Sequence, residues 1–226
     1  FNLNDVATVA KENGDKVIIN GKKSFVLNGK EADIIIVPAR TSGSQTETEG
    51  ISLFVVESDL PGISKNNYKS VDGHSASEIT FKNVEVNKDN LLGELGKGYQ
   101  TLESTIDDAT LAVCAEATGI MKSLHDKTVE YSKNRVQFGV PIGGFQALQH
   151  RMVDTLMACE ETESILLWAL TTNQDDSSSL KKAISGLKYQ IGTAGKHVGQ
   201  EAVQLHGGMG ISWELDIAHF FKRLSS

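Results

Sequence analysis

The chain has 226 residues, of which 39% are hydrophobic and 23% charged, and its formal net charge is -7. Lysine and arginine form no block, which argues against a nucleic-acid partner or an anionic membrane surface. No apolar run approaches the ~20 residues that cross a bilayer, so we expect no membrane span. Neither the histidines nor the two cysteines have metal-ligand spacing, and Cys114 and Cys159 are expected to be buried, reduced thiols.

Residues 1–97 have the pattern of a β domain. Residues 16–21 and 23–29 are short β-branched or aromatic runs that each end in Asn-Gly, and we expect a hairpin turn after each. The other predicted elements of this domain are strands at residues 32–39, 51–56 and 78–86 and a polar loop at residues 41–50. Several short strands with closely spaced turns predict a compact antiparallel sandwich or barrel.

Residues 91–98 form a predicted hinge, after which the hydrophobic period changes from two to about three and a half. The predicted helices contain residues 106–131, 145–172, 180–205 and 213–223. A polar break at residues 173–179 precedes the third helix, and its serines at 177–179 are candidate caps. Long helices with short connections predict an antiparallel four-helix bundle over residues 98–226, and hence an α+β fold for the whole chain.

Two stretches carry more specific side chains than helix connections require. Residues 135–150 contain an arginine, two phenylalanines and three glutamines around a bend at residues 139–144. Residues 204–210 have the sequence Gln-Leu-His-Gly-Gly-Met-Gly at the end of the third predicted helix. The guanidinium of Arg135 suits a diphosphate or a carboxylate, and the alternative is a solvated arginine at a helix C-terminus.

The glycine pair at residues 207–208 also has two possible interpretations. It lets a phosphate approach backbone N–H groups, or it is a simple helix break. Phe138 and Phe145 are expected to be core residues rather than stacking partners. From the residues alone, the chain is therefore a protein with an anion-friendly corner in a helical bundle.

The order of these motifs resembles the acyl-CoA dehydrogenase family over nearly the whole chain. The motifs are Arg-x-x-Phe-Gly-x-Pro-Ile, Phe-Gln-x-x-Gln-His and Val-Gln-Leu-His-Gly-Gly-Met-Gly, preceded by a β domain and a long helix. Residues 20–29 resemble the strand of the family's middle domain that packs on the flavin. Residues 83–99 resemble its exit into the helical domain. The family's N-terminal helical domain and the end of its C-terminal domain have no counterpart here, so we expect a piece of a longer protein.

The resemblance implies FAD-dependent oxidation of an acyl-CoA thioester to the 2,3-enoyl-CoA, with electrons passed to an electron-transfer protein. With oxygen as the acceptor, the enzyme would instead be an acyl-CoA oxidase. A homo- or hetero-oligomer, dimer or tetramer, that shares the FAD site is also implied, as is a bacterial cytoplasmic location. The sequences of residues 205–210 and 219–224 further resemble small subunits of bacterial heteromeric acyl-CoA dehydrogenases of the dicarboxyl or sterol type.

Matched by motif, Arg135 falls on the family arginine at the FAD diphosphate, with Gln137 and Phe138 beside it. Phe145 and Gln146 fall near the adenosine end of the cofactor. These assignments follow from the resemblance and are predictions for this chain.

The remaining FAD assignments lie outside that connection. Gln204, Gly207 and Gly208 match the glutamine and the glycines that meet the diphosphate and ribose through backbone donors. Phe25 matches an aromatic residue near the isoalloxazine ring. Leu27 stands where many members have a threonine that bonds the flavin.

The catalytic base is the main departure from the family pattern, and the catalytic residue of this chain is unknown. One family position for the glutamate falls at Ala109, which cannot accept a proton, and an adjacent family arginine falls at Thr110. Asp108 is a neighbour in sequence, but one helical residue turns a side chain by about 100°. The other family position lies beyond Ser226. A non-catalytic, FAD-binding subunit paired with a catalytic sister chain is therefore the alternative function.

Overall fold

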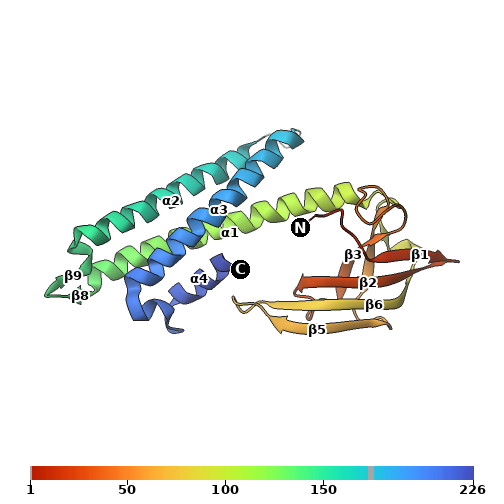
Figure 1. The fold of residues 1–226 in the computed structure, drawn as a ribbon, viewed down its shortest axis with the longest axis horizontal. Helices are drawn as coiled ribbons and strands as arrows, with labels where there is room; N and C mark the ends of the chain where they lie inside the picture. The colour runs from red at the N-terminus through yellow and green to blue at the C-terminus, as the bar shows by residue number, and fades with distance from the viewer. Residues whose placement is uncertain (1, 173–175) are drawn as a thin grey trace. The chain divides into compact units, whose positions relative to one another are not determined.

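The computed structural model describes residues 2–172 and 176–226, and these divide into two compact units between Ile106 and Asp107 (Figure 1). The first unit is a β-sheet and the second a helical bundle, which confirms the predicted α+β fold. Residues 173–175 of the predicted polar break lie outside the described part of the chain. No helix in the described part has a stretch long and apolar enough to cross a membrane.

The first unit is built on one seven-stranded sheet in the order β5-β6-β2-β1-β3-β4-β7. Its strands are β1 (Val9–Asn13), β2 (Lys16–Leu27), β3 (Ile34–Arg40), β4 (Ile51–Glu57), β5 (Ile63–Lys69), β6 (Ser75–Asn87) and β7 (Leu91–Leu92). The described strand pairs of this sheet are antiparallel, apart from β1 with β3, which is parallel. The sheet is therefore mixed, with one pairing that the sequence did not predict.

The hairpin turn expected at Asn20-Gly21 is wrong, because β2 continues through these residues. The register against β6 shifts there, and Asn20 Oδ1 accepts a hydrogen bond from Asn83 N at 2.8 Å. Gly21 has φ +147°, and a Cβ added to it would lie 2.6 Å from Thr8 Cα. Glycine is thus required by a close approach in a bulge and not by a chain reversal. The second Asn-Gly pair, at residues 28–29, lies in a turn, but β2 and β3 on either side of it are not neighbours in the sheet, so this turn does not form the expected hairpin.

The sheet packs an apolar core in which alternate residues of the longer strands point inward. Its fully buried members include Ile19, Val37, Phe54, Ile79 and Val84, each 0% exposed. Strands β1 and β5 were not predicted, because most of their side chains are polar or exposed and give no apolar alternation. Both strands form through pairing with longer neighbours, β2 and β6 respectively.

The second unit contains four helices, as predicted: α1 (Gly98–Asn134), α2 (Gln146–Thr171), α3 (Ser177–His206) and α4 (Asp216–Ser225). Successive helices run in opposite directions (Figure 1). α1 begins in the first unit and belongs to the bundle from Asp107 onward. The N-cap of α3 is Asp176, whose side chain accepts from Ser179 N at 3.2 Å, so the serine-cap prediction is wrong. A carboxylate accepts a hydrogen bond from the N-terminal amide as a serine hydroxyl would, and its negative charge also interacts favourably with the positive end of the helix dipole.

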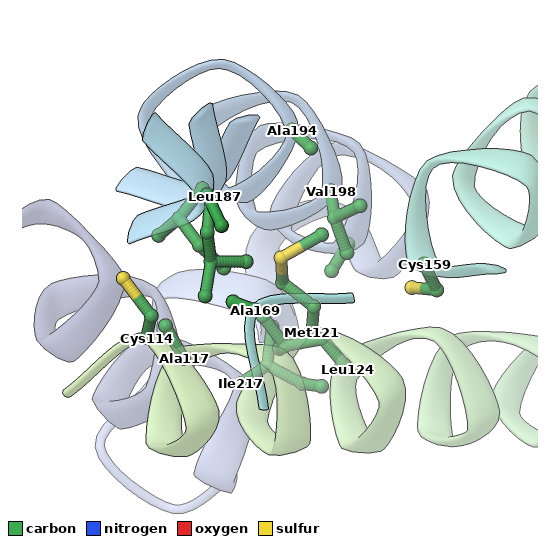
Figure 2. Packing of buried hydrophobic residues seen from close by; sticks show 13 residues of the cluster. Cys114, Ala117, Met121, Leu124, Cys159, Ala169, Leu187, Ala194, Val198 and Ile217 are labelled. Carbon is green, nitrogen blue, oxygen red and sulfur yellow. The ribbon is translucent and has the colours of Figure 1, made fainter. Parts of the chain in front are cut away.

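The bundle core gathers small and aliphatic side chains from all four helices (Figure 2). Met121 of α1 points toward Val198 of α3, and Leu187 of α3 and Ile217 of α4 complete the contact layer. The two cysteines are buried free thiols, as predicted. Around the rim, Arg223 of α4 donates two hydrogen bonds of 2.8 Å to Glu116 of α1.

A substitution at Leu187 tests whether burial of this apolar layer stabilises the bundle. Leu187 is 0% exposed, so Leu187→Ala should lower the free energy of unfolding by about 2–5 kcal/mol through lost burial and a residual cavity. Leu167→Ala is the control, because Leu167 is 56% exposed and its loss should cost less than about 0.5 kcal/mol. Urea unfolding followed by circular dichroism measures both, and equal losses would contradict the assigned core.

Candidate functional site

The connection between α1 and α2 is a small β-hairpin and not the loose bend expected over residues 139–144. β8 (Val136–Gln137) pairs with β9 (Val140–Pro141), and η2 (Ile142–Gly144) leads into α2. The tip residues, Phe138 and Gly139, both have positive φ, of 57° and 82°. Two positive φ values in a two-residue loop define a type I′ turn, whose twist matches that of the paired strands.

This tight turn directs the Phe138 side chain into solvent. Phe138 is 91% exposed, and its ring meets Phe145 edge-on, with centroids 6.2 Å apart and planes at 78°. The expectation that Phe138 is a core residue is therefore wrong, and Phe145 is itself 38% exposed. A bulky residue in the left-handed backbone region is uncommon and stores strain, which is a feature of ligand-binding positions.

At the end of α3 lie three neighbouring glycines, and the structure gives a reason for two of them. Gly207 ends the helix with φ 59°, a backbone region that side chains rarely adopt. Gly210 is buried, and a Cβ there would lie 2.9 Å from Val203 Cα and closer still to Val203 O. Gly208 has neither constraint, because an added Cβ would meet nothing within 4 Å. The chain itself therefore gives no reason for glycine at position 208.

A ring stack holds the two corners together. Tyr131, near the end of α1, stacks on His206, the last residue of α3, with centroids 4.3 Å apart and planes at 27°. His206 is buried, and its Nδ1 lies 2.8 Å from Ala202 O, which requires the proton on Nδ1. Burial lowers the pKa of His206, so the imidazole is neutral at physiological pH. Arg135 lies one helical turn beyond Tyr131, and its amide donates to Tyr131 O at 2.8 Å.

Between the corners lies an open depression of about 440 Å³, which we name the corner depression. Its lining consists of Tyr131, Arg135, Gln137, Ile142, Gln204, Leu205, His206, Gly207, Gly208 and Met209. Five of the nine predicted FAD contacts thus meet here in a single chain. Phe138, Phe145 and Gln146 do not line it, since they lie at the hairpin tip and the start of α2.

The chemistry of the corner depression suits an anion. Arg135 is exposed, and within the described residues its guanidinium forms no ion pair. Ile142 N donates to Arg135 O at 2.8 Å, which fixes the backbone of the arginine at the base of the hairpin. An unpaired guanidinium beside an amide side chain and an uncrowded glycine can take a phosphate or a carboxylate. Across the described residues, no three His, Cys, Asp or Glu side chains form a metal-binding cluster.

The ninth predicted contact, Phe25, belongs to the sheet unit. It lies in β2 with φ 53°, and its side chain is 55% exposed. Leu27, where the family often has threonine, is 61% exposed on the same strand. Ala109 and Asp108 are both exposed on α1. The structure thus supplies no carboxylate at the position that Ala109 occupies.

Sequence reasoning missed the residues that build the corner depression without matching a known contact. From the sequence, Tyr131 was only the last residue of the first predicted helix, residues 106–131, and His206 had no role. A usable signal existed for Tyr131, because residues i and i+4 share a helix face and Tyr131 precedes Arg135 by four. No local signal indicates that Ile142 and Met209 face the same space.

The chain belongs to the acyl-CoA dehydrogenase family. Residues 1–84 match the family's middle domain, and residues 96–226 match its C-terminal domain. The predicted family resemblance is therefore confirmed, while the resemblance to small subunits stays a prediction. Enzymes of this family depend on FAD.

Known relatives support this assignment. The chain is 33% identical to a 3-(aryl)acrylate reductase of Clostridium sporogenes, over 96% of this chain and 58% of that protein. It is 30% identical to the caffeyl-CoA reductase-Etf complex subunit CarC of Acetobacterium woodii, over 96% of this chain and 58% of that protein. The structure of butyryl-CoA dehydrogenase from Megasphaera elsdenii matches with a TM-score of 0.89 at 32% identity, covering 98% of this chain and 58% of that one. The chain thus spans less than two thirds of these relatives' length.

The surroundings of Gly208 and Gly210 predict different effects of the same substitution on the free energy of unfolding. Gly210→Ala should lower the free energy of unfolding by about 1–3 kcal/mol, because the new methyl group overlaps the Val203 backbone. Gly208→Ala should change it by less than about 0.5 kcal/mol, since the space around it is open. Thermal unfolding of both variants measures this difference. A Gly208→Ala protein as unstable as Gly210→Ala would show that Gly208 has a structural role after all.

Proposed function

We propose that this chain binds FAD and forms part of an acyl-CoA dehydrogenase that oxidises an acyl-CoA thioester to the 2,3-enoyl-CoA. The observation that carries the proposal is the corner depression, where Arg135, Gln204 and Gly208 meet around an open space. A family that depends on FAD and a matched arginine, glutamine and glycine set support the cofactor. FAD, when bound, supplies the acceptor for the hydride that leaves the acyl β-carbon.

The residues of the corner depression would hold the diphosphate of FAD. The Arg135 guanidinium offers a planar fork of N–H donors to two phosphate oxygens. Gln137 and Gln204 add amide donors, although Gln137 Nε2 donates to Val136 O at 2.8 Å in the free chain and would have to turn. The absent Cβ at Gly208 lets the phosphate come close to the backbone. The neutral His206 leaves Arg135 as the one positive side chain among the lining residues.

The aromatic pair at the hairpin would meet the other end of the cofactor. Phe138 and Phe145 expose ring faces beside Gln146, the first residue of α2. The Phe138 ring is 91% exposed in the isolated chain, which suggests that another group covers it in the assembled protein. The adenine of FAD or a neighbouring copy of this chain would be that group. Oligomerisation that shares the FAD site is part of the proposal.

The electron acceptor is proposed to be an electron-transfer flavoprotein. Relatives form complexes with such proteins, and the name of the Acetobacterium woodii subunit states one of them. The substrate is proposed to be an acyl-CoA thioester, as in the Megasphaera elsdenii butyryl-CoA dehydrogenase.

Removal of the Arg135 charge tests the cofactor assignment. We expect Arg135→Gln to weaken FAD binding by about 10- to 100-fold, because charge-assisted hydrogen bonds contribute roughly 1.5–3 kcal/mol. Lys133→Gln is the matched control, since it removes an equal charge from an exposed residue two positions away and should leave affinity unchanged. Titration followed by the quenching of flavin fluorescence measures both affinities.

Three results decide the proposal. A wild-type chain that binds no FAD overturns it. Equal affinities of the Arg135→Gln variant and the wild type would remove the corner depression from the cofactor site. Equal losses in the Arg135→Gln and Lys133→Gln variants would replace a specific contact with a general charge effect.

Ala109 favours a second function, that of an FAD-binding subunit that is not catalytic by itself. A general base contributes about 10²- to 10⁴-fold to a proton-transfer rate, and alanine supplies none. We therefore expect the chain alone to catalyse no exchange of the C2 proton of an acyl-CoA thioester, and Ala109→Glu to introduce that exchange.

Mass spectrometry of deuterium uptake at C2 measures this exchange. Asp108→Ala is the control, because Asp108 lies about 100° away around the helix and should not contribute. Efficient exchange by the unmodified chain would contradict the subunit function and leave the dehydrogenase function in place.

A further inference from the structure

The second irregularity of β2 lies at Ser24-Phe25. The register against β6 shifts between Lys23 and Val26, so that Ser24 and Phe25 face the single residue Glu78. Two residues opposite one define a β-bulge, a device that re-aims a side chain. The bulge therefore sets the direction of the Phe25 ring.

The backbone of Phe25 is in an unfavourable conformation. Its φ of 53° lies in the left-handed region, where a bulky side chain is a rare exception. Such strain persists only where neighbouring contacts hold it in place. The ring is nonetheless 55% exposed, so burial of the ring does not explain the conformation.

Glu78 supplies the contacts that hold the bulge. Its Oε1 accepts hydrogen bonds from Phe25 N at 3.2 Å and from Tyr68 Oη at 3.3 Å. Its Oε2 accepts from Ser24 Oγ at 3.0 Å and pairs with Lys22 Nζ at 2.7 Å. The Phe25 amide, which has no ladder partner in the bulge, is thus satisfied by a charged acceptor.

The charge on Glu78 is secured by the same contacts. Hydrogen bonds from Lys22 and then Ser24 lower the pKa of Glu78 to about 2, against partial desolvation. Its side chain is 24% exposed. On the same strand, Glu85 forms one ion pair, with Lys16 at 2.8 Å, and both of those side chains are 53% exposed. Glu85 therefore offers a matched carboxylate without the bulge contacts.

We propose that Glu78 is a positioning residue that fixes the strained amide of Phe25 and holds its ring where the isoalloxazine ring of FAD would meet it. The inference rests on the proposed function, since it names what supports the flavin-facing ring. The Tyr68 ring lies beside the Phe25 ring, with centroids 6.4 Å apart, and its hydroxyl donates to the same carboxylate. The carboxylate of Glu78 thus holds the Tyr68 side chain and the backbone of Phe25, which sets the direction of the Phe25 ring.

The first experiment needs no cofactor. In ¹⁵N-labelled protein, Glu78→Gln should speed hydrogen exchange of the Phe25 amide by about tenfold or more, because a neutral acceptor is weaker than a carboxylate. Glu85→Gln should leave this rate unchanged, and the amide of Ile79 in the sheet core reports whether the fold is intact. Unchanged Phe25 exchange in a folded Glu78→Gln protein overturns the inference.

A double-mutant cycle separates positioning from general stability. Glycine adopts positive φ without strain, so Glu78→Gln should lower the unfolding midpoint less in a Phe25→Gly background than in the wild type. An equal loss in both backgrounds overturns the inference, because Glu78 would then stabilise the sheet independently of Phe25.

A third experiment measures the environment of the bound flavin. With FAD bound, Glu78→Gln should change the visible circular dichroism of the flavin and weaken its affinity, whereas Glu85→Gln should change neither. A wild type that binds FAD together with an unchanged flavin signal in Glu78→Gln overturns this inference alone. A wild type that binds no FAD overturns the proposed function and the flavin role of Phe25, and amide exchange still decides whether Glu78 holds the bulge.

Discussion

The stack of Tyr131 on His206 is the contact on which the corner depression depends. It joins the ends of α1 and α3, which are separated by 75 residues in the chain, and Tyr131 Oη also lies 3.4 Å from His206 O. A neutral imidazole fits this position because burial lowers the pKa of His206 and Ala202 O accepts its Nδ1 proton. With the helix ends fixed, the hairpin and the glycines face one space. Arg135 then lies beside Gly207 and Gly208, which follow α3, without a competing ion pair among the described residues.

A second feature occurs once in each of the two units. Phe25 and Phe138 are the only phenylalanines of the described chain with positive φ, and both are predicted contacts of FAD. One lies in a β-bulge held by Glu78, and the other at the tip of a two-residue hairpin. Both rings are exposed, so burial of the ring does not offset the strain of either backbone conformation. Strained backbone that presents an aromatic face is expected where a planar ligand binds.

Residues of the same type have different structural roles in this fold. Asn20-Gly21 and Asn28-Gly29 are equal turn signals in sequence, yet the first is a bulge against Thr8 and only the second is a turn. At the end of α3, Gly207 is required by its backbone conformation and Gly210 by close packing, whereas Gly208 is under neither constraint. Ala109 shows the reverse case, because an alanine side chain cannot accept a proton wherever the fold places it.

The sequence alone determined the two-part α+β fold, the four helices and the family, and it predicted a set of residues that contact FAD. These follow from local periodicity and from motifs whose residues are close in the chain. Only the tertiary structure decided that five of those contacts share one depression, that Phe138 is exposed, and that Glu78 holds Phe25 across 53 residues of chain. The physical reason is that exposure, strand register and the meeting of helix ends depend on contacts between distant residues, which leave no periodic signal in the sequence.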